Sequence, residues 1–213
     1  MGIVLAIAIV LLLFDAQNIL AVSSRRVLRA GDVRSDDYTI IVPVYGHRRY
    51  FDERGHLAAY RERALVALDM AGHGMDDLAA ELEAEGWAVH RTRLPVPGPP
   101  ALILDALESG RVTTAYAFRM DADTCPVDDP APLVAEMARA GVDYASVCVR
   151  VQHPRRLVER IQALEYRMAM RGRRLRPWLS SGACYGGTAA ALRRVLSHHS
   201  MWFPGEDLEA GRI

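Results

Sequence analysis

The sequence predicts an α/β domain, a mostly parallel sheet with flanking helices, preceded by one N-terminal transmembrane helix. Short β-rich apolar runs alternate with helical patterns five times between residues 38 and 151, and parallel strands need helical crossovers of this kind. Two of the runs end on aspartates, at the carboxyl ends of strands, where ligands of doubly wound sheets bind. The chain also opens on a long apolar segment.

The N-terminal segment is long enough to cross a bilayer. An unbroken apolar run extends from Ile3 to Phe14 and resumes at residues 19–22. A helix over residues 2–22 would rise about 30 Å, the thickness of the hydrocarbon core. We therefore expect a transmembrane anchor at residues 1–22. A signal peptide and a docked amphipathic or core helix are the alternatives.

Basic residues set the expected orientation of this anchor. Arg25, Arg26 and Arg29 follow the apolar segment directly, and such residues stay on the cytoplasmic side. The sequence thus predicts a single-pass protein of the cell membrane with a cytoplasmic catalytic domain. Residues 23–37 are polar and form the predicted linker, so the folded domain spans residues 38–213.

Composition excludes several classes of protein. The 213 residues are enough for one domain, and 26 basic residues balance 26 acidic ones, so no nucleic-acid partner is expected. The three cysteines, Cys125, Cys148 and Cys184, form no paired motif. A reducing compartment therefore fits better than a disulfide framework or a zinc site.

Each predicted strand is a short apolar run rich in β-branched or aromatic residues. The five strands are Tyr38–Tyr45, Ala64–Asp69, Trp87–Leu94, Thr113–Met120 and Tyr144–Val151. The predicted helices carry apolar residues at helical spacing, often bounded by glycine or proline. They are Asp52–Arg63, Met75–Glu85, Ala101–Glu108, Pro130–Ala140, His153–Arg176 and Thr188–Leu196, and a glycine- and serine-rich loop is expected at 180–187.

The pair Asp121 and Asp123, separated by Ala122, is the clearest chemical signal. The two carboxylates follow the fourth strand. Together they can coordinate one hard divalent cation, such as Mg²⁺ or Mn²⁺, and contact a ribose. In isolation the motif is weak, because acids are common in surface loops. A phosphatase that uses a strand-end aspartate pair is a poorer alternative, because its threonine stands one position later than Thr124.

Asp69 ends the second strand. It either caps a turn or accepts hydrogen bonds from a nucleobase or ribose. Pro43 and Tyr45, at the end of the first strand, could frame the same base.

The segment Gly205-Glu206-Asp207 follows Trp202. An inverting sugar transfer needs a base that removes the acceptor's hydroxyl proton, and a carboxylate suits this role. The competing interpretation is a helix cap before Leu208.

Two further segments each have two interpretations. The loop at 180–187 could hold phosphate at a helix N-terminus, but a turn that shapes the acceptor pocket is the better interpretation. The arginine-rich end of the helix at 153–176 is either a solvated face or a contact with anionic lipid.

Taken in order, these segments resemble family 2 glycosyltransferases, especially the membrane-bound branch of cellulose, chitin and hyaluronan synthases and the nodulation-factor chitooligosaccharide synthase. The matching segments lie within residues 38–213 and are Ile40–Tyr45, Asp69, Asp121–Thr124, Arg160–Tyr166, Ser181–Cys184 and Gly205–Leu208.

The resemblance implies a GT-A fold, inversion at the anomeric carbon, and a nucleotide-sugar donor, in particular a UDP-sugar. It also implies residue roles: Asp69 binds the nucleoside of the donor, and Asp121 binds the donor. Asp123 ligates Mg²⁺ or Mn²⁺, and Asp207 is the catalytic base. Apart from the resemblance, we expect Gly182, Trp202 and Glu206 on the side of a carbohydrate or lipid-linked acceptor.

Two departures from the family pattern stand out. Residues 97–100, Pro-Gly-Pro-Pro, replace the usual Gly-Lys type of turn, and the chain ends at Ile213, before a Gln/Arg-x-x-Arg-Trp segment and later membrane helices. We therefore expect a GT-A domain that is incomplete at its C-terminus, and no processivity is predicted.

Overall fold

The computed structural model describes residues 28, 29, 31–95, 98–172 and 181–201, together with residues 2, 5–7, 9, 10, 12 and 13. The chain forms two compact parts. The sheet unit comprises Leu28–Val147 and Ser180–Ile213, and the α5 unit comprises Met1–Val27 and Cys148–Leu179.

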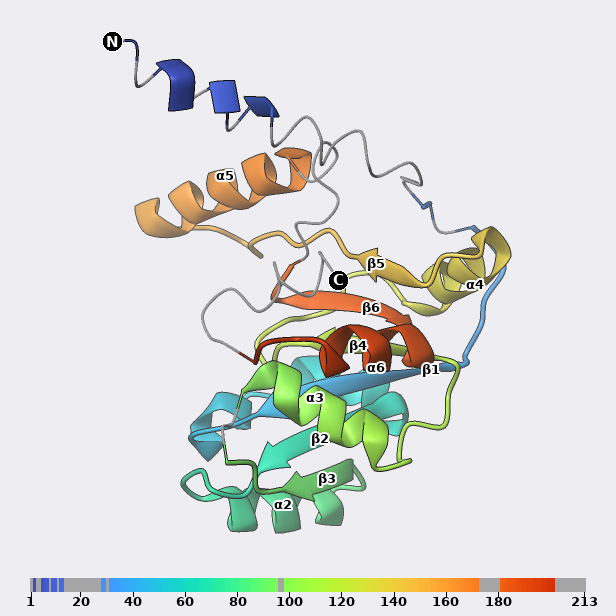
Figure 1. The fold of residues 1–213 in the computed structure, drawn as a ribbon. Helices are drawn as coiled ribbons and strands as arrows, with labels where there is room; N and C mark the ends of the chain where they lie inside the picture. The colour runs from blue at the N-terminus through green and yellow to red at the C-terminus, as the bar shows by residue number, and fades with distance from the viewer. Residues whose placement is uncertain are drawn as a thin grey trace. The chain divides into compact units, whose positions relative to one another are not determined.

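The sheet unit contains a six-stranded sheet in the order β3-β2-β1-β4-β6-β5 (Figure 1). Strands β3, β2, β1 and β4 run parallel, whereas β6 is antiparallel to both β4 and β5. The strands are β1 (Tyr38–Val44), β2 (Ala64–Asp69), β3 (Ala88–Thr92), β4 (Tyr116–Met120), β5 (Tyr144–Ser146) and β6 (Cys184–Thr188). The predicted mixed α/β, mostly parallel architecture is therefore confirmed.

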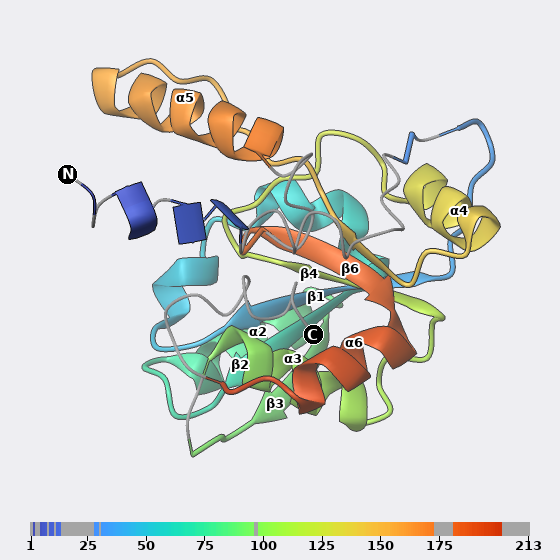
Figure 2. The ribbon, with the colours of Figure 1, turned by 45° about the horizontal axis from the view of Figure 1, so that its top comes forward.

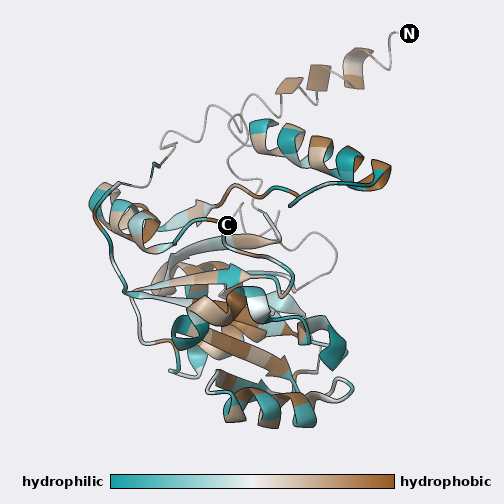
Figure 3. Cartoon of the chain, turned by 180° about the vertical axis from the view of Figure 1, so that it is seen from behind, coloured by the Kyte–Doolittle hydropathy of each residue, from teal (hydrophilic) through white to brown (hydrophobic). Residues whose placement is uncertain are grey.

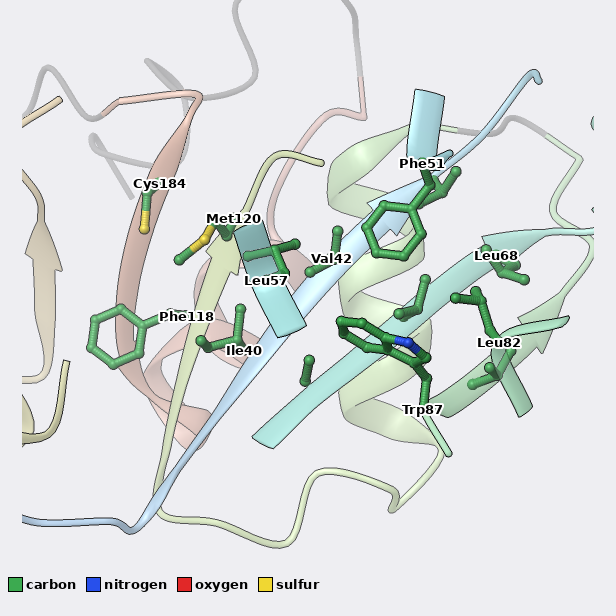
Figure 4. Close-up of a cluster of buried hydrophobic side chains, with 14 of the residues drawn as sticks. Ile40, Val42, Phe51, Leu57, Leu68, Leu82, Trp87, Phe118, Met120 and Cys184 are labelled. Carbon is green, nitrogen blue, oxygen red and sulfur yellow. The ribbon is translucent and has the colours of Figure 1, made fainter. Parts of the chain in front are cut away.

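Helices cover both faces of the sheet. Because side chains alternate along a strand, Ile40 and Val42 of β1 pack into one hydrophobic cluster, whereas Ile41 packs into the other. The first cluster includes residues of η1 (Arg48–Phe51), η2 (Gly55–Arg63), α2 (Met75–Ala84) and α4 (Ala131–Ala140) (Figure 4). The second includes α3 (Pro99–Glu108) and α6 (Ala189–Ser197), which lie together on the opposite face (Figure 2).

The prediction of a loop at 180–187 was wrong for its second half, because β6 begins at Cys184. Its two glycines allow close packing: a Cβ at Gly186 would overlap the ring of Phe118, and one at Gly187 would overlap the carbonyl oxygen of Asp143. These glycines therefore mark a crowded strand rather than a turn.

The predicted helix Asp52–Arg63 was also wrong in type. Within that range the chain forms one 3₁₀ segment, η2, which residues 52–54 separate from the preceding segment η1. The Arg54 side chain is buried and donates to Glu85 and Glu81 of the α2 region. This ion-pair cluster fixes the chain against α2 and accounts for the interruption.

Helix α5 spans Leu157–Gly172, so it starts later than the predicted His153. Pro154 precedes this start, and the Glu159 carboxylate accepts hydrogen bonds from the backbone N–H groups of Arg155 (2.7 Å) and Arg156 (2.9 Å). These bonds satisfy N–H groups at the helix start. Residues 173–176 of the predicted helix lie outside the described residues.

Among the residues that the structure describes, no helix has the length and apolar character needed to span a bilayer. Much of the predicted anchor at 1–22 lies outside those residues.

Candidate functional site

The carboxyl ends of β1, β2 and β4 bring several predicted site residues to one edge of the sheet. Val44 is in register with Leu68, so Tyr45 and Asp69 follow at the same level. The β1–β4 ladder ends at the pair Ile41 and Arg119. Pro43 stands just beyond this pair, and proline has no N–H group with which to continue a ladder. The sheet edge thus carries Tyr45, Asp69 and Asp121 on neighbouring strands.

Asp121 begins a tight turn directly after β4. Its carbonyl oxygen accepts from the N–H of Thr124 at 3.0 Å, and its own N–H donates to the carbonyl of Ala183 at 3.0 Å. The second bond extends the pairing of β4 with β6, so Gly182 lies beside the turn. Asp123 is exposed on the same turn. The structure therefore places Asp121, Asp123 and Gly182 close to one another.

Arg119 is a site residue that the sequence reasoning missed. It is only 2% exposed, its Nη2 donates to Oδ1 of Asp121 at 2.7 Å, and its guanidinium lies 5.6 Å from the ring centre of Tyr185. A charged hydrogen bond of this kind orients a carboxylate strongly. The available signal was an arginine within an apolar strand, two residues before Asp121 and hence on the same side of the chain.

Asp69 shapes the turn after β2. Its Oδ1 accepts from the N–H of Ala71 at 3.1 Å, and its carbonyl oxygen accepts from the N–H of Gly72 at 3.0 Å. Asp69 therefore caps the turn after β2, as one of its two interpretations expected. Because the residue is only 2% exposed, it leaves little surface for a bound nucleoside to contact.

Two loops beside Asp69 are joined through their backbones. The N–H of His73 donates to the carbonyl of Gly46 at 2.8 Å, and the N–H of Arg48 donates to the carbonyl of His73 at 3.0 Å. A Cβ at Gly72 would come within 3.0 Å of the Gly46 backbone, so glycine permits this close approach. The rings of His47 and His73 lie 5.0 Å apart, which adds two imidazoles to the edge near Tyr45.

Cys184 lies next to this edge but is not a nucleophile. It is in register with Met120, and burial raises the pKa of its thiol to about 12. Since the thiolate is the reactive form, the buried thiol contributes packing rather than chemistry.

The residues near Asp121 fit a divalent cation that is shared with a ligand. The described residues contain no group of three or more His, Cys, Asp or Glu side chains arranged as a metal cage. Mg²⁺ and similar ions are commonly held by one or two carboxylates, with phosphate oxygens and waters completing the shell. The exposed Asp123 and its neighbour Asp121 offer such a sparse set.

Three predicted residues are not placed by the structure. Asp207, Glu206 and Trp202 lie outside the described residues, so their predicted roles as base and acceptor-side residues stay predictions.

A solved structure with the same type of fold supports the α/β architecture described above. The chain is similar to a mannosyltransferase from Pyrobaculum calidifontis, solved in complex with GDP-Man and Mn²⁺, with a TM-score of 0.58 and 16% identity over 93% of this chain. This chain spans 57% of the length of that protein.

Two further structures are less similar. A mycobacterial protein has a TM-score of 0.42 at 16% identity, covering 79% of this chain and 59% of the other. A putative glucose-1-phosphate thymidylyltransferase from Bacillus anthracis, in complex with a sucrose, has a TM-score of 0.44 at 11% identity, covering 83% and 78%. No protein-family model and no curated protein sequence matches the chain. The chain therefore shares the overall fold of a mannosyltransferase, in agreement with the predicted GT-A type.

Proposed function

We propose that this protein is a metal-dependent glycosyltransferase that moves a hexosyl unit from a nucleotide sugar to a carbohydrate or lipid-linked acceptor. The observation that carries the proposal is the turn of Asp121 and Asp123 at the carboxyl end of β4. It occurs in a fold shared with a mannosyltransferase solved with GDP-Man and Mn²⁺. Fold alone does not define an activity, so the proposal depends on the chemistry of this turn.

In this proposal Asp123 holds Mg²⁺ or Mn²⁺, and Asp121 contacts the donor beside it. A divalent ion bound there would offset the negative charge of the diphosphate leaving group. Arg119 keeps the Asp121 carboxylate in one orientation through their 2.7 Å hydrogen bond. Because Asp123 is exposed, its carboxylate can coordinate the ion while the ion also binds the phosphate oxygens of the donor.

The nucleoside of the donor would lie at the ends of β1 and β2, where Tyr45 is accessible and the buried Pro43 and Asp69 shape the backbone beneath it. The resemblance to family 2 enzymes favours a UDP-sugar, whereas the mannosyltransferase was solved with GDP-Man. Both donors should therefore be tested. The neighbouring imidazoles of His47 and His73 could donate hydrogen bonds to the diphosphate.

The acceptor would approach from the side of Gly182, with Trp202 and Glu206 nearby. Asp207 would take the proton of the acceptor hydroxyl as its oxygen bonds to the anomeric carbon and the bond to the nucleoside diphosphate breaks on the opposite side. This single displacement inverts the anomeric carbon. We further propose membership of the membrane-bound family 2 branch, with the anchor at residues 1–22 in the cell membrane and the sheet unit in the cytoplasm.

An assay of donor hydrolysis and transfer tests the proposal. The full chain is supplied with Mn²⁺ and either UDP-sugars or GDP-mannose, and compared with the Asp123→Ala and Asp207→Asn variants. Loss of an essential catalytic carboxylate lowers rates by roughly 10²–10⁴-fold, and we expect losses of this order. Asp128→Ala is the matched control, because Asp128 is an exposed acid that follows the same turn.

Other outcomes separate the rival functions. Nucleotide binding without turnover in the wild-type chain would favour a binding module that lacks catalytic activity. A phosphoaspartate trapped at Asp121 would instead favour phosphatase chemistry. Unchanged rates in both aspartate variants would refute the assigned roles.

A further inference from the structure

Helix α5 exposes a continuous apolar stripe. Leu157, Ile161, Leu164 and Met168 are between 51% and 73% exposed. Their spacing of four, three and four residues places them on one face of the helix. None of the residues of α5 is buried. Figure 3 shows the alternation of hydrophobic and hydrophilic residues along this helix.

The opposite face of α5 is the more covered one. Glu159, Ala163, Tyr166 and Met170 are half-buried, and the Sδ atom of Met170 accepts a hydrogen bond from the N–H of Val149 at 3.4 Å. A helix on a water-soluble domain turns its apolar stripe inward and its charged face outward. In α5 the apolar stripe stays exposed, and the described residues leave it uncovered, so another apolar surface would have to cover it.

A row of arginines runs along one side of this stripe. Arg160, Arg167 and Arg171 each lie three or four residues along the helix from a member of the stripe, so they are its neighbours on the helix surface. All three are exposed. Residues 155–172 contain five arginines and two glutamates, an excess of three positive charges. The partner of this face should therefore combine an apolar layer with negative charge at its border.

We propose that α5 lies in the plane of an anionic lipid surface. The apolar stripe would enter the boundary between headgroups and acyl chains, and the arginine row would meet the lipid phosphates. Charge complementarity favours this occupant over an apolar protein surface, which would leave the arginine row unpaired. The proposal depends neither on the transferase activity nor on the anchor at residues 1–22.

Two labelled variants of the full chain test this proposal. Cys125 and Cys148 are replaced by serine, while Cys184 is buried and can stay. An environment-sensitive NBD probe is then attached at Ile161→Cys on the stripe, or at Ala163→Cys on the half-buried opposite face as the matched control. Both proteins are mixed with phosphatidylcholine vesicles, with or without phosphatidylglycerol, that contain a spin-labelled lipid.

We expect several-fold stronger quenching of the probe at position 161 than at position 163, and only with phosphatidylglycerol present. Each arginine near an anionic surface contributes about five-fold in partitioning. Replacement of Arg160, Arg167 and Arg171 by glutamine should therefore remove most of the difference, with unchanged circular dichroism. Equal quenching at both positions would overturn the proposal. So would a probe at position 161 that is shielded without lipid, because that result indicates a protein partner.

Discussion

The sheet unit buries a charged side chain, whereas the α5 unit exposes apolar ones. In the sheet unit, the charged Arg119 is buried beside the Asp121 carboxylate, within a strand whose other residues are apolar. In the α5 unit, apolar residues such as Ile161 and Leu164 face solvent, while the half-buried side includes Glu159. Both arrangements cost free energy in an isolated chain in water.

Under the two proposals, each part would bind a different kind of partner. A buried charge next to an exposed carboxylate turn is suited to a polar, charged ligand such as a nucleotide sugar with its metal ion. An exposed apolar stripe bordered by arginines is suited to an anionic membrane surface. The same chain would then hold a donor at the sheet edge and a lipid surface at α5.

The largest expected effect on stability is the difference between truncating a buried leucine of the sheet unit and an exposed leucine of the α5 unit. Leu192 of α6 is fully buried, whereas Leu164 of α5 is exposed. Leu192→Ala should lower the free energy of unfolding by about 2–5 kcal/mol, because it leaves a cavity. Leu164→Ala should change it by less than about 0.5 kcal/mol. Urea unfolding of both variants measures this contrast, and equal losses would show that α5 is covered within the free chain.

Replacement of Arg119 tests the buried charge of the sheet unit. Arg119→Leu removes the partner of Asp121 and should cost about 2–3 kcal/mol of stability. It should also weaken donor binding, since Asp121 is no longer held in one orientation. Arg119→Lys keeps the charge without the planar fork and should recover part of both losses. If Arg119→Leu matched the wild type in donor affinity, Arg119 would have no positioning role.

A smaller effect should appear as a change in the pH dependence of stability. The hydrogen bonds from Arg54 lower the pKa of both Glu81 and Glu85. A lowered pKa in the folded state stabilises the protein above the ordinary value near 4.5, and this stability is lost as the pH falls below it. Arg54→Gln should flatten the decline in the urea midpoint between about pH 5 and pH 3. An unchanged decline would mean that other carboxyl groups cause it.

Much of the fold was predictable because local patterns and tertiary packing agree. The runs at 38–45, 64–69 and 113–120 contain β1, β2 and β4, and their ends place Asp69 and Asp121 at one sheet edge. Strand β6 was not predictable from its own residues. Gly186 and Gly187 usually indicate a turn, and only the packing of Phe118 and the Asp143 backbone against them explains a strand.

In the candidate site, only the strand-end positions of the aspartates were predictable. Aspartates at strand ends are visible in the sequence, so the positions of Asp121 and Asp123 followed from the topology. The role of Arg119 did not, because burial of a charged side chain depends on neighbours such as Tyr185 from a distant segment. The turn made by Asp69 likewise required the backbone geometry after β2.

Calorimetry of nucleotide binding tests the central claim most directly. UDP and GDP are each titrated into the wild-type chain and into Asp123→Ala, with and without Mn²⁺, with Asp128→Ala as the control. We predict that the wild type and Asp128→Ala bind one of the nucleotides only with Mn²⁺, and that Asp123→Ala loses at least about ten-fold in affinity, or about 1.4 kcal/mol. Equal affinity in the presence and absence of Mn²⁺, or in the wild type and Asp123→Ala, would contradict a metal-dependent donor site at this turn.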